Sequence, residues 1–223
     1  MQWPGSLCDA SPVQAELIAR VALAGLVTAL VIVVGLRILL HRRRTGSSGV
    51  TAFQDTIGTP QWWGGVGFVL GFVVIVAGLV VAALGHGISG DLPIWLVAIG
   101  VLLGFLGAGG AWWCQHTMGE SWGFGVTDER SPELVTKGAF GVIRNPIYTF
   151  MLFGLLGCIL LAPGLITILG WLLLLVSVQY LVRVVEEPYL LRTIPAYAAY
   201  AARAGRFLPG IGRLNPTGQI PAG

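Results

Sequence analysis

Long stretches without a charged side chain constrain this chain more than any other feature. Residues 21–36, 62–90, 92–119 and 145–182 contain no Lys, Arg, Asp or Glu. A helix of about 20 apolar residues spans the hydrocarbon core of a bilayer. Hydrophobic residues make up 55% of the chain and charged residues 10%, a composition that excludes an ordinary soluble domain. The sequence therefore predicts an all-α, polytopic integral membrane protein.

The apolar stretches divide into five predicted transmembrane helices, with the ranges 15–40, 62–84, 92–113, 147–161 and 165–185. The fourth rises only about 22 Å, at about 1.5 Å per residue. That is less than the hydrocarbon thickness of roughly 30 Å. We therefore expect the turn at 162–164 to lie within the membrane.

Basic residues predict the orientation of these helices. The sequence His-Arg-Arg-Arg at 41–44 follows the first span directly. With five spans, this cluster lies on the same side as most other basic residues, namely Arg130, Lys137, Arg144, Arg192, Arg203, Arg206 and Arg213. Lys and Arg gather on the cytoplasmic side, so the N-terminus is expected outside and the C-terminus in the cytoplasm. Arg37, near the end of the first span, is expected to extend to the membrane interface.

Composition adds three further expectations. Twelve Arg against one Lys, with abundant Ala, Gly and Val, are typical of a GC-rich bacterial genome and predict a bacterial plasma membrane. Cys8, Cys114 and Cys158 are far apart in the sequence, which predicts free thiols and no metal site. The basic residues follow the topology and form no stripe, so no nucleic-acid partner is expected.

Four glycines give the third span a face of small residues: Gly104, Gly107, Gly109 and Gly110. Such faces let helices approach closely in lipid. The alternative interpretation is that they leave room for a ligand or a lipid tail.

Two polar groups are expected to meet at one end of the predicted hairpin. Arg144-Asn145 precedes its first arm, and Glu186-Glu187 ends its second arm. An antiparallel hairpin returns to the face it left, so the groups are neighbours although Arg144 and Glu186 are 42 positions apart. Polar groups at membrane depth are costly unless paired, and they often mark function. Interfacial anchoring and ion pairing are the structural alternative.

The chemistry of this group suits a particular kind of ligand. An arginine and two carboxylates suit a zwitterion, and backbone amides with aromatic faces suit a purine. A cationic sulfonium is favoured near carboxylates or aromatic faces.

Several motifs in order along the chain resemble the isoprenylcysteine carboxyl methyltransferase family, to which phospholipid N-methyltransferases are related. They are Lys137-Gly138-Ala139-Phe140, Arg144-Asn145-Pro146-Ile147-Tyr148, Glu186-Glu187, Tyr197, Tyr200 and Arg206-Phe207-Leu208-Pro209. The resemblance covers about residues 115–210. It implies a membrane bundle whose C-terminal half binds S-adenosyl-L-methionine on the cytoplasmic side.

The resemblance also implies roles for individual residues. The implied cofactor-binding residues are Pro132, Glu133, Leu134, Val135, Phe140, Asn145, Pro146, Ile147, Tyr148, Glu186 and Glu187. Arg183 is the nearest match to an arginine that acts on the substrate in the family, and Arg144 matches the motif arginine. Three regions follow: the first helix with a basic cytoplasmic linker (1–61), the second and third helices (62–114), and a cofactor-binding methyltransferase region with the hairpin and a cytoplasmic tail (115–223).

The sequence departs from the family pattern at three places. Asn145 stands where the family usually has a histidine, so this position cannot titrate. Ala139-Phe140 replaces a usual Pro-Tyr and lacks its hydroxyl, and Ile194-Pro195 replaces a usual Phe-Gly.

The predicted function is therefore S-adenosylmethionine-dependent methylation of a lipophilic acceptor at the cytoplasmic membrane face. The preferred acceptor is a carboxylate of the isoprenylcysteine type, which needs no general base. The expected partners are membrane lipids and a lipophilic small-molecule or prenylated substrate. Three alternatives stay open: a phospholipid or amine N-methyltransferase, an NADPH-dependent enzyme of the sterol-reductase type, and a non-enzymatic membrane protein.

Overall fold

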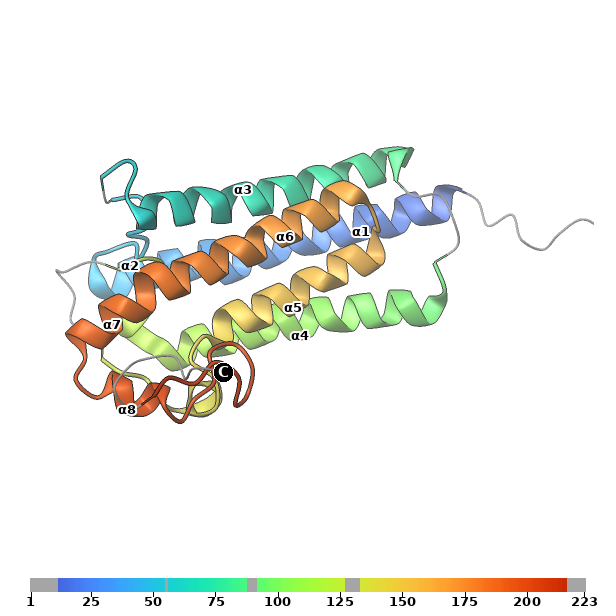
Figure 1. Ribbon diagram of the computed structural model, residues 1–223. Helices are drawn as coiled ribbons and strands as arrows, with labels where there is room; N and C mark the ends of the chain where they lie inside the picture. The colour runs from blue at the N-terminus through green and yellow to red at the C-terminus, as the bar shows by residue number, and fades with distance from the viewer. Residues whose placement is uncertain (1–11, 55, 88–91, 127–132, 216–223) are drawn as a thin grey trace, which may run out of the picture.

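The bundle consists of long apolar helices that lie side by side in the computed structural model, which describes residues 12–54, 56–87, 92–126 and 133–215 (Figure 1). In chain order the helices are as follows. The first runs through α1 (Pro12–Leu30), the π-helical segment η1 (Val31–Leu36) and α2 (Arg37–Thr45); the second comprises α3 (Pro60–Val81) and η2 (Ala82–His86); the third comprises α4 (Ile94–Met118) and η3 (Gly119–Ser121). The hairpin is α5 (Pro146–Leu161) followed by α6 (Leu165–Tyr180), which continues through η5 (Leu181–Glu186) into α7 (Glu187–Thr193). Two short elements, η4 (Gly138–Gly141) and α8 (Tyr197–Ala201), lie beside the bundle end that carries α7.

The predicted fold class is confirmed. Within the described residues the regular secondary structure is helical, and β-pairing is limited to isolated bridges. Four helical segments are long and apolar enough to cross a membrane: Val13–Thr45, Pro60–His86, Ile94–Ser121 and Leu165–Thr193. The fifth, α5, is apolar but has 16 residues. The turn between α5 and α6 stops short of the far ends of α1 and α4 (Figure 1).

Local sequence explains where these helices begin. Thr59 caps α3, because its side chain accepts a hydrogen bond from the Trp62 amide at 3.3 Å, and Pro60 suits the first helical position. Pro146 likewise occupies the start of α5, directly after Asn145. The helix of α2 ends at Gly46, which adopts a left-handed conformation with φ 76°.

Helix pairs pack through glycine. α3 packs against α6, where a Cβ on Gly71 would lie 2.9 Å from the Leu174 backbone nitrogen. α4 packs against α5, where a Cβ on Gly107 would lie 2.3 Å from the Gly154 Cα. Apolar surface gives little drive to helix association within lipid, so such close backbone contact is what holds helices together there.

The glycines of α4 serve both of the purposes considered from the sequence: some allow close helix packing, and others leave open space. Gly107 and Gly110 lie against α5, with a Cβ on Gly110 only 2.3 Å from the Phe150 ring. Gly104 and Gly109 have no atom within 4 Å of an added Cβ, and both line a large cavity. One helix therefore supplies both a packing surface and open space.

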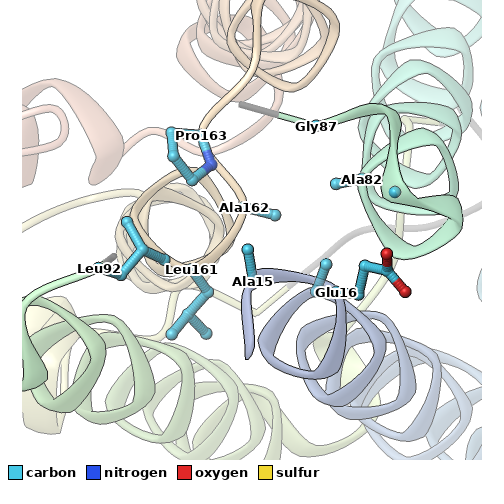
Figure 2. A pocket seen from close by; sticks show the side chains of 10 residues that line it. Ala15, Glu16, Ala82, Gly87, Leu92, Leu161, Ala162 and Pro163 are labelled. Atoms are coloured by element: carbon cyan, nitrogen blue, oxygen red, sulfur yellow. The ribbon is translucent and has the colours of Figure 1, made fainter. Parts of the chain in front are cut away.

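A small cavity lies at the bundle end away from α7, between α1, η2 and the α5–α6 turn (Figure 2). Its volume is about 30 Å³, and Ala15, Ala82 and Ala162 are among its lining residues. This is room for about one or two water molecules, so this cavity is too small for a cofactor.

Gly107→Ala is expected to lower the free energy of unfolding in detergent by about 1–3 kcal/mol, because the added methyl group overpacks the contact with α5. Gly104→Ala, three residues earlier on the same helix, is the control and is expected to leave stability unchanged or slightly raised. Thermal unfolding followed by circular dichroism measures both. Equal effects of the two variants would contradict the packing assignment.

Candidate functional site

A cavity of about 1010 Å³ lies between α1, α4 and α5. It is closed at one end by the loop residues 121–126, the segment 140–145 and the start of α7, and its walls are mostly apolar. This volume is at the upper end of the range for small-molecule sites. The cavity therefore has room for a cofactor together with part of a lipophilic molecule.

The cavity reaches the outer surface of the bundle. Val21 and Ile32 on the first helix and Phe105 on α4 line it, yet they are 60%, 44% and 75% exposed. These residues lie within apolar spans. A lipophilic chain can therefore enter from the side of the bundle that faces lipid.

The chain before α5 is fixed by the C-terminal tail. The amide of Arg144 donates to the Gly205 carbonyl at 2.7 Å, and the amide of Asn145 donates to the Arg206 carbonyl at 3.1 Å. The Asn145 side chain donates to the same Arg206 carbonyl at 3.1 Å. Gly205 is required here, since a Cβ would lie 1.9 Å from the Leu208 carbonyl oxygen. The tail thus sets the position of the residues that begin α5.

A buried ion cluster joins three segments at this point. Glu187, at the start of α7, pairs with Arg144 at 2.6 Å and with Arg206 at 2.8 Å. The side chains of Arg144, Arg206 and Glu187 are 1%, 5% and 6% exposed. Buried charges need both a counter-charge and filled hydrogen bonds, and this cluster has both.

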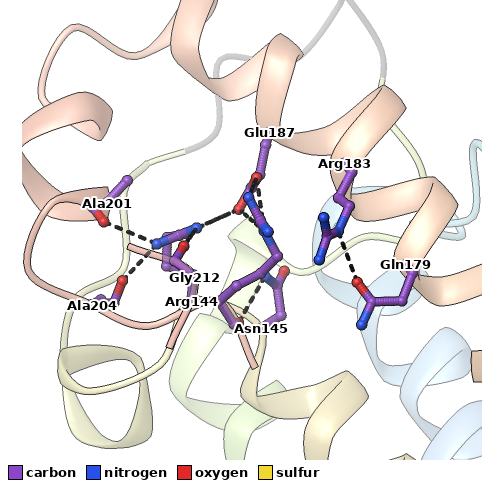
Figure 3. Close-up of polar contacts among 9 residues, drawn as sticks. Arg144, Asn145, Gln179, Arg183, Glu187, Ala201, Ala204 and Gly212 are labelled. Carbon is purple, nitrogen blue, oxygen red and sulfur yellow. Dashed lines mark hydrogen bonds and ion pairs between the residues drawn. The ribbon is translucent and has the colours of Figure 1, made fainter. Parts of the chain in front are cut away.

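Every N–H donor of the Arg144 guanidinium is used within the protein (Figure 3). Nε and Nη2 donate to Glu187 Oε1, Nη1 donates to the carbonyls of Ala201 and Ala204, and Nη2 also donates to the carbonyl of Gly212. A guanidinium has five N–H donors, which matches these five contacts. Arg144 therefore lines the cavity without a spare donor for a ligand.

Glu186 differs from its neighbour. It lines the cavity, and the Tyr148 hydroxyl donates to its Oε1 at 2.6 Å. Successive residues on a helix point about 100° apart, so the two glutamates face different sides. The π-helical turn η5 ends at Glu186, and such turns often occur at functional positions. One carboxylate faces the cavity, and the other faces the ion cluster.

Two tyrosines of α8 support the same loop. The Tyr200 hydroxyl donates to the Phe140 carbonyl at 2.6 Å, and the Tyr197 and Tyr200 rings meet edge to face with centroids 5.9 Å apart. Burial raises the pKa of Tyr200 to about 12, against the opposing effect of the Arg144 charge. Burial, and next the Glu187 charge, raise the pKa of Tyr197 as well. Both hydroxyls therefore stay protonated at neutral pH.

Aromatic rings form one wall near Glu186. The Phe68 ring lies 4.7 Å from Phe124 and 6.3 Å from Tyr148, measured between centroids, and all three residues line the cavity. A carboxylate beside aromatic faces attracts a cation.

A scan against family models matches residues 95–195 to the phospholipid methyltransferase family. The match begins in α4 and ends after α7, so it includes both arms of the hairpin and both glutamates. The resemblance that the sequence motifs indicate is thereby confirmed over residues 95–195, which match a family of membrane methyltransferases.

A curated relative is the nickel-cobalt-cadmium resistance protein NccN of Alcaligenes xylosoxydans xylosoxydans, which is 30% identical over 142 residues. The match covers 63% of this chain and 64% of that protein, so the chain spans less than two thirds of the relative's length. Among the residues that the structure describes, there is no group of three His, Cys, Asp or Glu that could hold a metal ion.

The structure brings most of the predicted site residues to one cavity. Its lining includes Phe140, Arg144, Asn145, Pro146, Ile147, Tyr148 and Glu186.

Several predicted residues lie elsewhere. Glu133, Leu134, Val135 and Glu187 are outside the lining, and Leu134 packs against the cluster around Tyr197 and Tyr200. Arg183 is exposed, donates to Gln179 at 2.9 Å and does not line the cavity (Figure 3). Pro132 lies outside the described residues.

Other residues of the site were missed from the sequence. Arg206 was noticed only as part of a motif, yet it supplies half of the counter-charge to Glu187. The sequence also did not predict the contacts of Arg37, which is 2% exposed, donates to the Gly119 carbonyl and lies 5.1 Å from the Trp122 ring centroid. The segment after α4 folds back over the end of the first helix, and a sequence pattern does not reveal such a contact.

Glu187→Ala is expected to lower the free energy of unfolding by about 3–5 kcal/mol, since it leaves two arginines buried without a carboxylate. Glu186→Ala removes one hydrogen bond and is expected to cost about 1 kcal/mol. Denaturant unfolding in detergent compares these adjacent substitutions. A greater loss from Glu186→Ala would contradict the assignment of Glu187 to the ion cluster.

Proposed function

We propose that this protein is an S-adenosyl-L-methionine-dependent methyltransferase that acts on a lipophilic acceptor at the cytoplasmic face of a bacterial plasma membrane. One observation carries the proposal: the Glu186–Tyr148 pair lies at the polar end of a large apolar cavity that opens toward lipid. The phospholipid methyltransferase match over the same elements supports it. The cytoplasmic placement rests on the basic residues near this end.

The residues present fit the cofactor. Its sulfonium and ammonium groups are cationic, and Glu186 is the acidic residue of the described cavity lining. The aromatic wall of Phe68, Phe124 and Tyr148 gives faces that suit a cation or a purine. We assign cofactor contacts to Glu186, Tyr148 and the segment 145–147, with Phe140 beside them. When bound, S-adenosyl-L-methionine supplies an electrophilic methyl group.

The chain contributes alignment and exclusion of water. The apolar walls desolvate the reacting groups, and the tail fixes the segment 144–145 so that α5 begins at a defined place. Arg144 and Glu187 act as positioning residues, since their polar atoms are committed to each other and to the tail. Arg183 is outside this proposed centre because it does not line the cavity. The proposed cofactor contacts come from region 115–223. Helices of regions 1–61 and 62–114 line the part of the cavity that we assign to the acceptor.

The reductase alternative has less support. Arg144 is the basic residue of the described cavity lining, and all of its donors are used. A 2′-phosphate of NADPH would need a free cation or several free donors.

The test is calorimetric titration of purified protein in detergent with S-adenosyl-L-methionine. Wild type is expected to bind saturably, and Glu186→Gln is expected to weaken binding about tenfold or more, because hydrogen bonds to charged groups contribute about 1.5–3 kcal/mol. Tyr148→Phe keeps the ring and is expected to have a smaller effect.

Glu120→Gln is the matched control, since Glu120 is exposed and outside the cavity. Its affinity is expected to equal that of wild type. A folded wild-type sample without saturable binding would overturn the proposal, and binding of NADPH in its place would favour the reductase.

A further inference from the structure

We propose that the turn formed by residues 208–211 of the C-terminal tail rests on the membrane surface and binds anionic lipid headgroups there. The sequence predicts a cytoplasmic tail, whereas here one turn of that tail lies in the interfacial layer of the bilayer. The methyltransferase proposal is not needed for this placement.

The turn is closed by hydrogen bonds and carries two exposed apolar side chains. The Ile211 amide donates to the Leu208 carbonyl at 3.1 Å, and the Arg206 amide donates to the Ile211 carbonyl at 2.7 Å. Pro209 and Gly210, with φ 76° at Gly210, suit the two central positions of a type II turn. Leu208 is 41% exposed and Ile211 is 64% exposed. These side chains therefore stay at the surface of a defined turn.

Contacts with α5 set the depth of this turn. The Thr149 hydroxyl donates to the Phe207 carbonyl at 2.8 Å, and Phe207 packs against the core cluster that includes Leu152 and Leu155 of α5. Thr149 is three residues after Pro146, the first residue of α5, which is about 4.5 Å along the helix. The residue directly before the turn is therefore level with the first turn of α5.

The length of α5 places that level in the membrane. Its 16 residues rise about 24 Å, which is less than the hydrocarbon thickness of roughly 30 Å. An apolar helix this short has no length to spare outside the membrane. The tail lies beside the start of α5 (Figure 1), so its exposed apolar turn is at the depth where headgroups meet acyl chains.

Hydrophobicity and charge together identify the partner. Apolar side chains that enter the boundary between headgroups and acyl chains stabilise membrane contact, and nearby cations add attraction to anionic lipids. Arg213 supplies the cation, since it is exposed and its Nη2 would lie 3.8 Å from a Cβ on Gly210. None of the ion pairs between described residues includes Arg213. The bilayer already surrounds α5 at this depth, so contact with lipid needs no further partner.

The experiment uses full-length protein in lipid nanodiscs, with a bimane label on Ile211→Cys. Cys114 and Cys158 are buried, and Cys8→Ser removes the remaining native thiol. The same protein without the introduced cysteine gives the background signal. Lipids that carry a nitroxide on the upper part of the acyl chain quench a label that lies in the interface.

Two reference positions calibrate the quenching. Val176→Cys reports lipid, because Val176 is 64% exposed on the apolar helix α6. Arg43→Cys reports water, because Arg43 is exposed in the basic cluster at the end of α2. Quenching of the label at Ile211 is expected to approach that at Val176 and to exceed that at Arg43 severalfold.

Headgroup preference is measured with two nitroxide lipids at the same low mole fraction, phosphatidylglycerol and phosphatidylcholine. The anionic lipid is expected to quench the label at Ile211 more strongly, with a local enrichment of up to about fivefold from one arginine. Arg213→Gln is expected to abolish the difference while quenching by phosphatidylcholine is kept. Arg42→Gln, which changes an exposed arginine on α2, is the matched control and is expected to preserve it.

Three results would overturn the proposal. Quenching at Ile211 as weak as at Arg43 would place the turn in water or, if aqueous iodide also fails to quench, against a second copy of the chain. Equal quenching by the two headgroups would remove the anionic site, as would a preference that survives Arg213→Gln. No readout uses S-adenosyl-L-methionine, so failure here is distinguishable from failure of the methyltransferase proposal.

Discussion

The buried cluster of Arg144, Glu187 and Arg206 is the interaction on which the polar end of the bundle depends. It joins the chain before α5, the start of α7 and the C-terminal tail, which are separate in the sequence. Arg144 also gives donors to three tail carbonyls, which would otherwise be short of partners away from water. One carboxylate and two guanidinium groups are stable here because each charge is paired and hydrogen-bonded. The loop that forms the end of the cavity is ordered through these bonds.

The same cluster explains why the two adjacent glutamates, Glu186 and Glu187, make different contacts. Glu187 pairs with both arginines, whereas Glu186 accepts a hydrogen bond from Tyr148 at the cavity. A helix turns about 100° per residue, so two adjacent glutamates serve different purposes without any break in the backbone. The arrangement leaves Glu186 and aromatic faces at the cavity, and these groups underlie the proposed cofactor site.

Small residues shape the rest of the cavity. α4 approaches α5 through Gly107 and Gly110, whereas Gly104 and Gly109 leave open space on the same helix. The first helix forms another wall, and the cavity reaches the outer surface there, because Val21 and Ile32 both line it and are exposed. The proposed cofactor contacts and the proposed acceptor space therefore come from different parts of the chain, and the family match over 95–195 covers the first of these more fully than the second.

Much of this architecture was predictable from the sequence. Charge-free apolar stretches determine the helices, because lipid offers no partner for an exposed backbone polar group. Hairpin geometry brings Arg144 near Glu186 and Glu187, since antiparallel arms return to one face. The sequence did not separate the roles of the two glutamates, find the pairing of Arg206 or place Arg37 beside Trp122. These features depend on side-chain direction and on contacts between distant segments, which only the packed tertiary structure decides.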